Sequence, residues 1–94
     1  MLYMVIERYR DRNAAAVYDR AREKGRMLPD GLVYIDSWVE PNFDRCFQLM
    51  RCDDPGLFDV WTQRWSDLVE FEIVPVVTSK EASDRAPARL TPRS

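Results

Sequence analysis

Hydrophobic and polar residues alternate in short stretches of this chain, and a period of two is typical of β-strands that bury one face. Residues 32–40 (LVYIDSWVE) and 45–52 (RCFQLMRC) show the alternation most clearly. Residues 2–9 (LYMVIERY) and 69–77 (VEFEIVPVV) are short and rich in β-branched and aromatic residues, which predicts two more strands. Because Pro75 cannot donate a hydrogen bond to a neighbouring strand, the last strand is expected at an edge of the sheet.

Two other stretches repeat apolar residues every three or four positions, which is the pattern of helices. The first is expected to begin after Asn13, a favourable N-cap, and to end at Gly25. The second begins with Asp54 as the N-cap and Pro55 at the first helical position. The apolar stripes are Ala14, Val17, Tyr18 and Ala21 in the first helix, and Phe58, Trp61, Trp65 and Leu68 in the second.

The elements follow the order strand, helix, strand, strand, helix, strand. With right-handed crossovers, this order predicts an α+β fold of the ferredoxin-like βαββαβ type. Its four-stranded antiparallel sheet has the first and third strands in the centre and both helices on one face. Residues 1–78 are predicted to form this domain, and the polar residues 79–94 are predicted to form a C-terminal tail.

The alternation on the second and third strands also predicts the two faces of the sheet. The helix side is expected to hold Val33, Ile35, Ser37, Val39, Phe47 and Leu49, packed with Trp61 and Trp65. The open side is expected to hold Tyr34, Asp36, Trp38, Glu40, Cys46, Gln48 and Met50. An open face with this many large apolar side chains favours a homodimer that packs sheet to sheet.

The first strand fits the sheet in either of two phases. In one phase Met4, Ile6 and Arg8 lie on the open face, and in the other phase the odd-numbered residues from Tyr3 to Tyr9 lie there. The first phase is favoured, because an open face that carries acidic side chains would gain a cation from Arg8.

Length and charge narrow the class of protein. The chain has 94 residues, of which 46% are hydrophobic, and this is enough for one domain with one core. A formal net charge of −2 disfavours binding to nucleic acids or to acidic membranes.

Glu7 interrupts the first apolar run, which excludes a signal peptide or a spanning helix at this end. Cys46 and Cys52 are too far apart on one strand for a disulfide, so two free thiols and a cytoplasmic location are expected.

Three segments resemble a known family: "MLYMVIER", "GRMLPDGLVYIDSWVE" and "RCFQLMRCDDPGLFDVWTQRWSDLVEFEIVPV". They are similar to the bacterial family called domain of unknown function 3303, over residues 1 to about 78. That family in turn resembles the dimeric α/β-barrel superfamily, in which two ferredoxin-like halves close a barrel around a central cavity. The resemblance implies such a cavity. It implies no particular reaction, because the superfamily contains cofactor-independent monooxygenases, haem-degrading enzymes, chlorite dismutases and small isomerases.

A barrel cavity would make six residues candidates for binding a ligand. Asp36 and Glu40 lie roughly 13 Å apart on one strand face, so they cannot form a carboxylate dyad within one chain. One of them is a general base or polar anchor with a raised pKa, or both pair with arginines at the rim. Trp38 is either an aromatic wall or an interface anchor. The full candidate set is Arg8, Tyr34, Asp36, Trp38, Glu40 and Gln48, with Gln48 expected to bond to Tyr34 or Trp38.

The residue types limit the chemistry of such a site. The chain has no histidine, which excludes a haem ligand of the imidazole type and a His–Cys zinc site. Asp53 and Asp54 are explained by a helix cap, so no metal and no cofactor are expected. Two functions remain: a homodimer whose sheet face serves assembly, or a dimeric barrel that binds or converts a small organic molecule. An amino-acid sensor and an RNA-binding sheet are less favoured alternatives.

Overall fold

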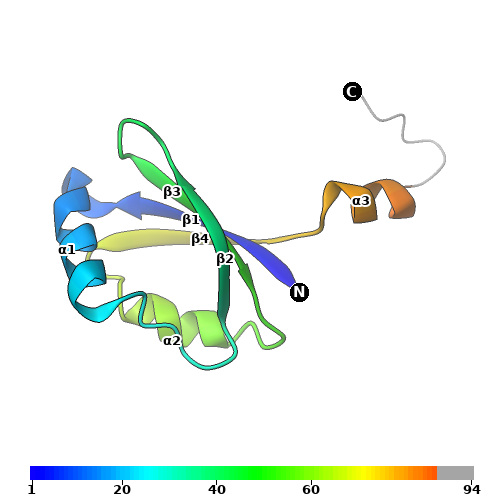
Figure 1. Cartoon of the computed structure of the whole chain (residues 1–94), viewed down its shortest axis with the longest axis horizontal. Helices are drawn as coiled ribbons and strands as arrows, with labels where there is room; N and C mark the ends of the chain where they lie inside the picture. Colours follow the sequence, from blue (N-terminus) through cyan, green and yellow to red (C-terminus); the bar gives the residue numbers. More distant parts are fainter. Residues whose placement is uncertain (87–94) are drawn as a thin grey trace.

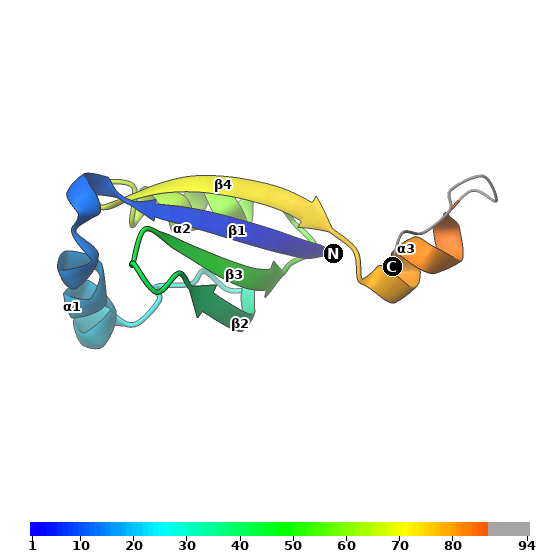
Figure 2. The ribbon, with the colours of Figure 1, turned by 90° about the horizontal axis from the view of Figure 1, so that it is seen from above.

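The computed structural model describes residues 1–86 and shows an α+β fold with one four-stranded antiparallel sheet (Figure 1). Its strands are β1 (Leu2–Tyr9), β2 (Val33–Val39), β3 (Arg45–Arg51) and β4 (Val69–Val76). They lie in the order β2-β3-β1-β4, which Figure 2 shows from above. The first and third strands therefore occupy the centre as predicted, and β4 with its Pro75 lies at an edge. This arrangement is compatible with a ferredoxin-like fold.

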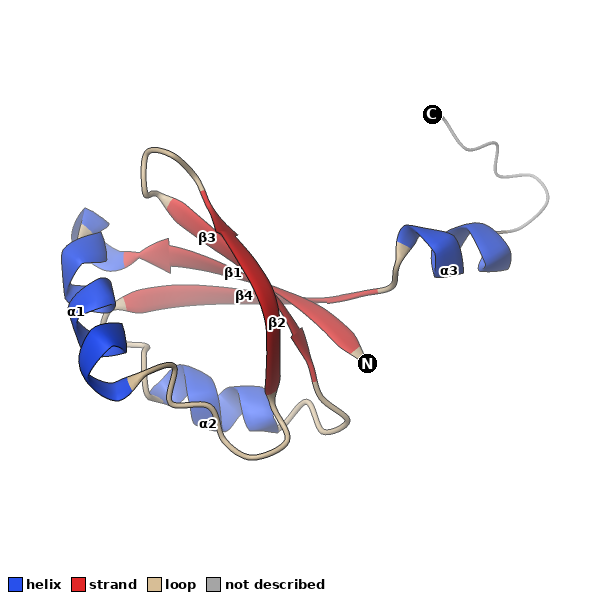
Figure 3. Ribbon diagram, viewed as in Figure 1, coloured by secondary structure: helices blue, strands red, loops and turns tan. Residues whose placement is uncertain are grey.

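Two helices cover one face of the sheet, and the sequence signals at their ends explain where they begin and end. In α1 (Ala14–Lys24), the side chain of Asn13 accepts a hydrogen bond from the amide of Ala16 at 3.1 Å, and Gly25 follows with φ 66°. A short 3₁₀ turn, η1 (Arg10–Arg12), connects β1 to this helix. Figure 3 shows that α1 lies across one end of the sheet, whereas α2 lies beneath its middle.

The second helix, α2 (Leu57–Gln63), is shorter than its apolar stripe predicts. Asp54 accepts from the amide of Gly56 at 2.9 Å, as a cap does, but the regular helix begins only at Leu57. After Gln63 the amide of Trp65 bonds to the carbonyl of Thr62, an i→i−3 bond that tightens the chain into a turn. Trp65 is still buried, so the predicted packing of this segment is kept.

A third helix, α3 (Ser79–Arg85), lies in the segment that was expected to be a tail. The Thr78 side chain accepts a hydrogen bond from the amide of Glu81, and this T-x-x-E spacing is that of a capping box. The helix is exposed and stands away from the sheet (Figure 1). Residues 87–94 of the predicted tail lie outside the described residues, and the domain boundary at residue 78 stays a prediction.

The core lies between the sheet and the helices. Val5 and Met50 on the central strands, Trp61 on α2 and Val69 on β4 are almost completely buried there. Tyr3 and Phe58 pack edge to face, with ring centroids 4.9 Å apart. The burial of Trp61 and Trp65 confirms the predicted apolar side of the second helix.

The strand pairing corrects the predicted faces of β3. Val5 lies opposite Gln48 and Glu7 lies opposite Cys46, and paired residues of antiparallel strands share a face. The odd-numbered side of β1 is buried, so Cys46, Gln48 and Met50 face the helices, and the prediction that they lie on the open side is wrong. Phe47 and Leu49 lie on the open face instead of in the core. The favoured phase of β1 is correct, since Met4, Ile6 and Arg8 lie on the open face.

An irregularity at Ile35 corrects the predicted faces of β2. The pairing with β3 shifts by one residue between Tyr34 and Asp36, which is the signature of a β-bulge. Tyr34 therefore faces the helices with its partner Met50, while Asp36 lies on the open face. Val33 and Ile35 are 41% and 42% exposed and do not belong to the core that was predicted for them.

Candidate small-molecule site

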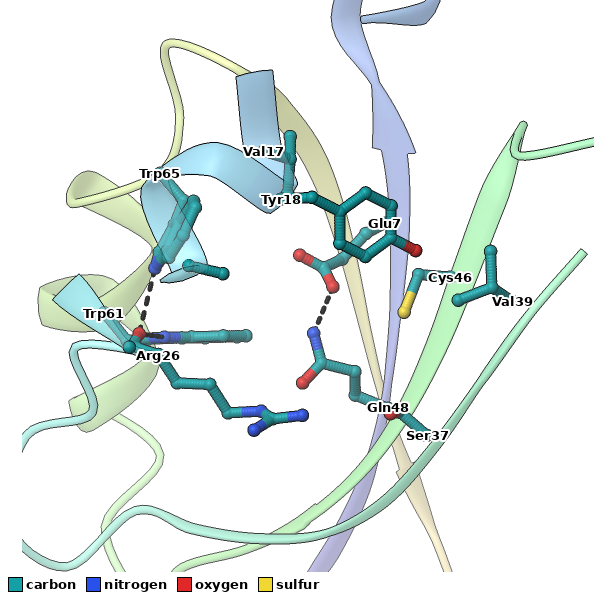
Figure 4. A pocket seen from close by; sticks show the side chains of 12 residues that line it. Glu7, Val17, Tyr18, Arg26, Ser37, Val39, Cys46, Gln48, Trp61 and Trp65 are labelled. Carbon is teal, nitrogen blue, oxygen red and sulfur yellow. Dashed lines mark hydrogen bonds between the residues drawn. The ribbon is translucent and has the colours of Figure 1, made fainter. Parts of the chain in front are cut away.

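A cavity of about 240 Å³ lies between the helix-covered face of the sheet and the two helices (Figure 4). We call it the inner cavity. Its walls come from all three central parts of the fold: the strands β1, β2 and β3, the helix α1 with the loop after it, and α2 with the turn after it. Its lining residues are Glu7, Val17, Tyr18, Ala21, Gly25, Arg26, Ser37, Val39, Cys46, Gln48, Trp61 and Trp65.

Glu7 and Gln48 form a buried polar pair on the two central strands. Gln48 lies opposite Val5, two residues before Glu7 on β1, so the two side chains are diagonal neighbours on the same face. The amide Nε2 of Gln48 donates a hydrogen bond to Oε1 of Glu7. Their side chains are buried, with 6% and 8% of the residue surface exposed. Burial raises the pKa of Glu7, while the bond from Gln48 and the neighbouring Cys46 and Arg26 oppose that rise.

The other end of the Gln48 amide carries an unpaired acceptor. Oε1 is fully buried, and it has no hydrogen-bond partner among residues 1–86. A buried carbonyl oxygen without a partner costs free energy, so native structures rarely leave one unexplained. Because Gln48 lines the inner cavity, an occupant of that cavity is the natural source of a donor.

Arg26 closes the side of the cavity next to this pair. Its guanidinium lies over the ring of Tyr34, with the Cζ atom 3.6 Å from the ring centroid, which is cation–π geometry. The hydroxyl of Tyr34 shares a hydrogen bond of 2.5 Å with that of Ser37. Figure 4 shows the Arg26 side chain extending toward Gln48, and its positive charge slightly opposes the rise in the pKa of Glu7.

The main chain of Arg26 holds the two tryptophans of the cavity wall. Its carbonyl accepts hydrogen bonds from the indole N–H of Trp61 at 2.9 Å and of Trp65 at 3.0 Å (Figure 4). The polar edges of both indoles are thereby satisfied, and their apolar rings are left to line the cavity.

The cysteines of this region are buried and free, as the sequence predicted. Burial, and secondly the charge of Glu7, raises the pKa of the Cys46 thiol to about 12. Burial raises the pKa of Cys52 as well. Both thiols are therefore protonated at neutral pH and are poor nucleophiles or metal ligands.

The structure separates the six residues that the sequence proposed as one site. Tyr34 and Gln48 face the helices, whereas the other four lie on the open face: Arg8, Asp36, Trp38 and Glu40. Gln48 bonds to Glu7, so the expected bond to Tyr34 or Trp38 is wrong. These six side chains do not converge on one ligand within a single chain.

One of the open-face residues, Glu40, has the simpler role considered for it, an ion pair with an arginine. Glu40 forms a bidentate ion pair with Arg45, with N–O distances of 2.6 and 3.1 Å, and this bond lowers the pKa of Glu40. The carboxylate of Asp36 accepts from the amide of Ser37 at 2.8 Å. Trp38 is 53% exposed, so it forms no wall of the inner cavity.

Sequence reasoning missed most residues of the inner cavity, above all Glu7, Arg26 and the indoles. One signal was available for Glu7. The odd-numbered phase of the first strand contains Tyr3, Val5 and Tyr9, and burying that phase places Glu7 inside. No comparable signal exists for Arg26, because its place depends on the path of the loop between α1 and β2.

Taken together, the geometry defines a small α+β protein in which a buried polar pair lies at the wall of a largely apolar cavity between the sheet and the helices. The chain belongs to the family described as Domain of unknown function (DUF3303), whose model matches residues 1–89. This confirms the resemblance found in the sequence. Neither a curated protein nor a solved structure matches the chain.

Among residues 1–86, no helix combines the length and apolarity that crossing a membrane requires. In the same range, histidine, cysteine and acidic side chains do not gather in groups of three or more that could hold a metal ion.

Proposed function

We propose that this protein binds a small organic molecule in the inner cavity. The observation that carries the proposal is the buried oxygen of Gln48, which is unpaired within residues 1–86 and belongs to a side chain that lines a cavity of about 240 Å³. Apolar walls with a few convergent polar groups are the usual composition of small-molecule sites. An engineered apolar cavity of about 150 Å³ binds benzene, so the volume here suffices for a ring with a substituent.

The proposed function is binding rather than conversion. Of the groups that line the inner cavity, the Cys46 thiol is protonated at neutral pH and the Ser37 hydroxyl is bonded to Tyr34. Neither is activated as a nucleophile by a neighbouring base. Covalent catalysis by a nucleophile therefore has no support from these two side chains.

The three tryptophans provide an internal test of the site. Trp61 and Trp65 line the inner cavity, whereas Trp38 lies on the opposite face of the sheet. We expect a mixture of small neutral ring compounds to shift the indole ¹H–¹⁵N signals of Trp61 and Trp65 and to leave that of Trp38 in place. Absence of any shift, together with native mass spectra that show no retained ligand, would remove the proposal.

A matched pair of α1 variants shows whether the ligand enters the cavity. Ala21 lines the cavity and Ala15 is exposed on the same helix. Ala21→Leu should fill part of the cavity and abolish the shifts, whereas Ala15→Leu should preserve them. Equal behaviour of the two variants would locate the binding elsewhere.

We propose as a second function that the open face of the sheet assembles two copies of the chain. This face carries Trp38, 53% exposed, together with Met4, Ile6, Phe47 and Leu49. It also carries charges of both signs, which a two-fold axis can bring into opposition. The basic residues of this face are Arg8, Arg45 and Arg51, and the acidic residues are Asp36, Glu40, Glu70 and Glu72. We infer a ferredoxin-like half that pairs sheet to sheet with its copy to close a dimeric α/β barrel in the cytoplasm.

A further inference from the structure

The groups around the inner cavity restrict the charge of its ligand. Glu7 lies on one side and Arg26 on another, so the polar end of the cavity carries both an acidic and a basic group. An anionic or a cationic ligand would meet one group of like charge and one of opposite charge, so neither ion gains a clear electrostatic advantage here. Either ion would lose hydration among the indole rings of Trp61 and Trp65. A neutral molecule avoids that loss.

The hydrogen-bonding groups of this end restrict the ligand further. The free position on Gln48 is an acceptor, so the ligand must supply an N–H or O–H donor there. Arg26 is exposed and its guanidinium can only donate, so a ligand group next to it must accept. In Figure 4 the oxygen of Gln48 and the guanidinium of Arg26 point toward the same part of the cavity. One ligand group that both donates and accepts would serve both residues.

We propose that the ligand is a neutral, planar ring compound with a carboxamide or lactam group, whose N–H donates to Gln48 and whose carbonyl accepts from Arg26. This inference rests on the proposed binding function and specifies the ligand class for that cavity. The ring would lie among the apolar faces of Trp61 and Trp65, whose N–H groups are already engaged with the main chain of Arg26. The volume of about 240 Å³ accommodates one such ring with its substituent.

Four probes of nearly equal shape separate the parts of this proposal. Benzamide is neutral, with both a donor and an acceptor, and acetophenone replaces its amino group with a methyl group and so lacks the donor. Benzoate and benzamidinium carry a negative and a positive charge on the same frame. Each would be titrated into the full chain, with the indole signals of Trp61 and Trp65 as the readout and that of Trp38 as the reference.

Benzamide should bind most tightly. Acetophenone should bind about tenfold more weakly, the factor expected for one lost hydrogen bond between neutral groups. Benzoate and benzamidinium should bind more weakly than benzamide as well. Equal affinity for benzamide and acetophenone would overturn the role of Gln48, and tighter binding of either ion would overturn the neutral class. In both cases a small-molecule site would still exist.

Protein variants test the same contact from the other side. Gln48→Met removes the acceptor while keeping the length of the side chain, and Gln63→Met makes the same change at an exposed position of α2. Gln48→Met should reduce the benzamide preference over acetophenone to about one, and Gln63→Met should leave it unchanged. The comparison of benzamide with acetophenone on the unaltered protein decides the matter if Gln48→Met does not fold.

The outcome in which no probe binds also has a definite meaning. If no probe shifts the cavity indoles but the protein taken from its host retains a small molecule in native mass spectra, the proposed ligand class is wrong and the binding function stands. If no probe binds and no molecule is retained, both proposals fail together.

Discussion

The two faces of the sheet are built from alternate residues of the same strands, yet they manage polar groups in opposite ways. On the helix side, Glu7 and Gln48 are buried and satisfy each other only in part. On the open side, Glu40 and Arg45 form a bidentate pair at the surface, next to the exposed Trp38. The inner face thus offers one unsatisfied acceptor beside a largely apolar cavity, and the outer face offers apolar surface between paired charges.

This difference separates two kinds of recognition. A small molecule can satisfy a single buried acceptor and fill a cavity of about 240 Å³. A second protein surface instead covers a broad apolar face and matches its charges. Variants of the same residue type on the two faces provide direct tests of that division.

The largest expected effect is on stability and concerns tryptophan. Trp61 is 2% exposed, so Trp61→Ala leaves a cavity in the core and should lower the free energy of unfolding by about 3–5 kcal/mol. Trp38→Ala on the open face should change it by less than about 1 kcal/mol when dilute protein is used. Urea denaturation measures both, and equal losses would contradict the distinction between the faces.

The next effect concerns assembly. Trp38→Asp places a charge within the apolar part of the open face and should convert the proposed dimer to a monomer in sedimentation experiments. Val60→Asp makes the same change at an exposed apolar position of α2 and should leave the dimer intact. A dimer that persists in Trp38→Asp would require an interface elsewhere.

A smaller effect is expected from the ionisation of Glu7. Burial raises its pKa above the ordinary value of 4.5, so the unfolded chain loses this proton at a lower pH than the folded chain does. Ionisation therefore favours unfolding: the stability is complete below pH 4.5 and decreases as the pH rises toward the raised pKa of the folded state. Glu7→Gln removes the titration, and its stability relative to the unaltered protein should increase from acid to neutral pH.

Denaturation at several pH values would measure this difference. Glu72→Gln, on an exposed position of the edge strand β4, serves as the control and should show no such trend. A pH-independent difference between Glu7→Gln and the unaltered protein would mean that Glu7 has the same pKa in the folded and unfolded states, and it would contradict the raised pKa.

The smallest effect is expected from the surface ion pair. Arg45 lowers the pKa of Glu40, yet both side chains remain partly exposed to solvent and salt. Glu40→Gln should therefore change the unfolding midpoint only slightly, and the change should disappear at high ionic strength. A large, salt-independent loss would show that Glu40 is buried in the assembled protein.

Local signals in the sequence were sufficient to predict the four strands and the helices α1 and α2, but not α3 or the phase of every strand. Asn13, Gly25 and Pro75 each act through backbone hydrogen bonds or dihedral angles, so their effects are local. In β3 both faces are partly apolar: Cys46 and Met50 alternate with Phe47 and Leu49. Only the register between β3 and β1 decides which face is buried, and this register cannot be predicted from the residues of β3 alone.

The candidate site shows the same limit. Gln48 was identified from sequence as a candidate ligand residue, but its partner Glu7 lies 41 residues away, and nothing in the sequence indicated that the two side chains would pair. The bulge at Ile35 reverses the side on which Tyr34 lies, and no Gly or Pro marks it. Arg26 reaches the cavity only because the loop after α1 passes beneath the sheet, so this contact is a property of the complete fold.

The carbonyl of Arg26, shared by two indoles, also has a kinetic consequence. Movement of this carbonyl away from the two tryptophans must break the bonds to Trp61 and Trp65 together. Such a joint opening is expected to be rarer than the fluctuations of an ordinary surface loop. Deuterium exchange at the two indole nitrogens would report how often both bonds break, even before any ligand is known.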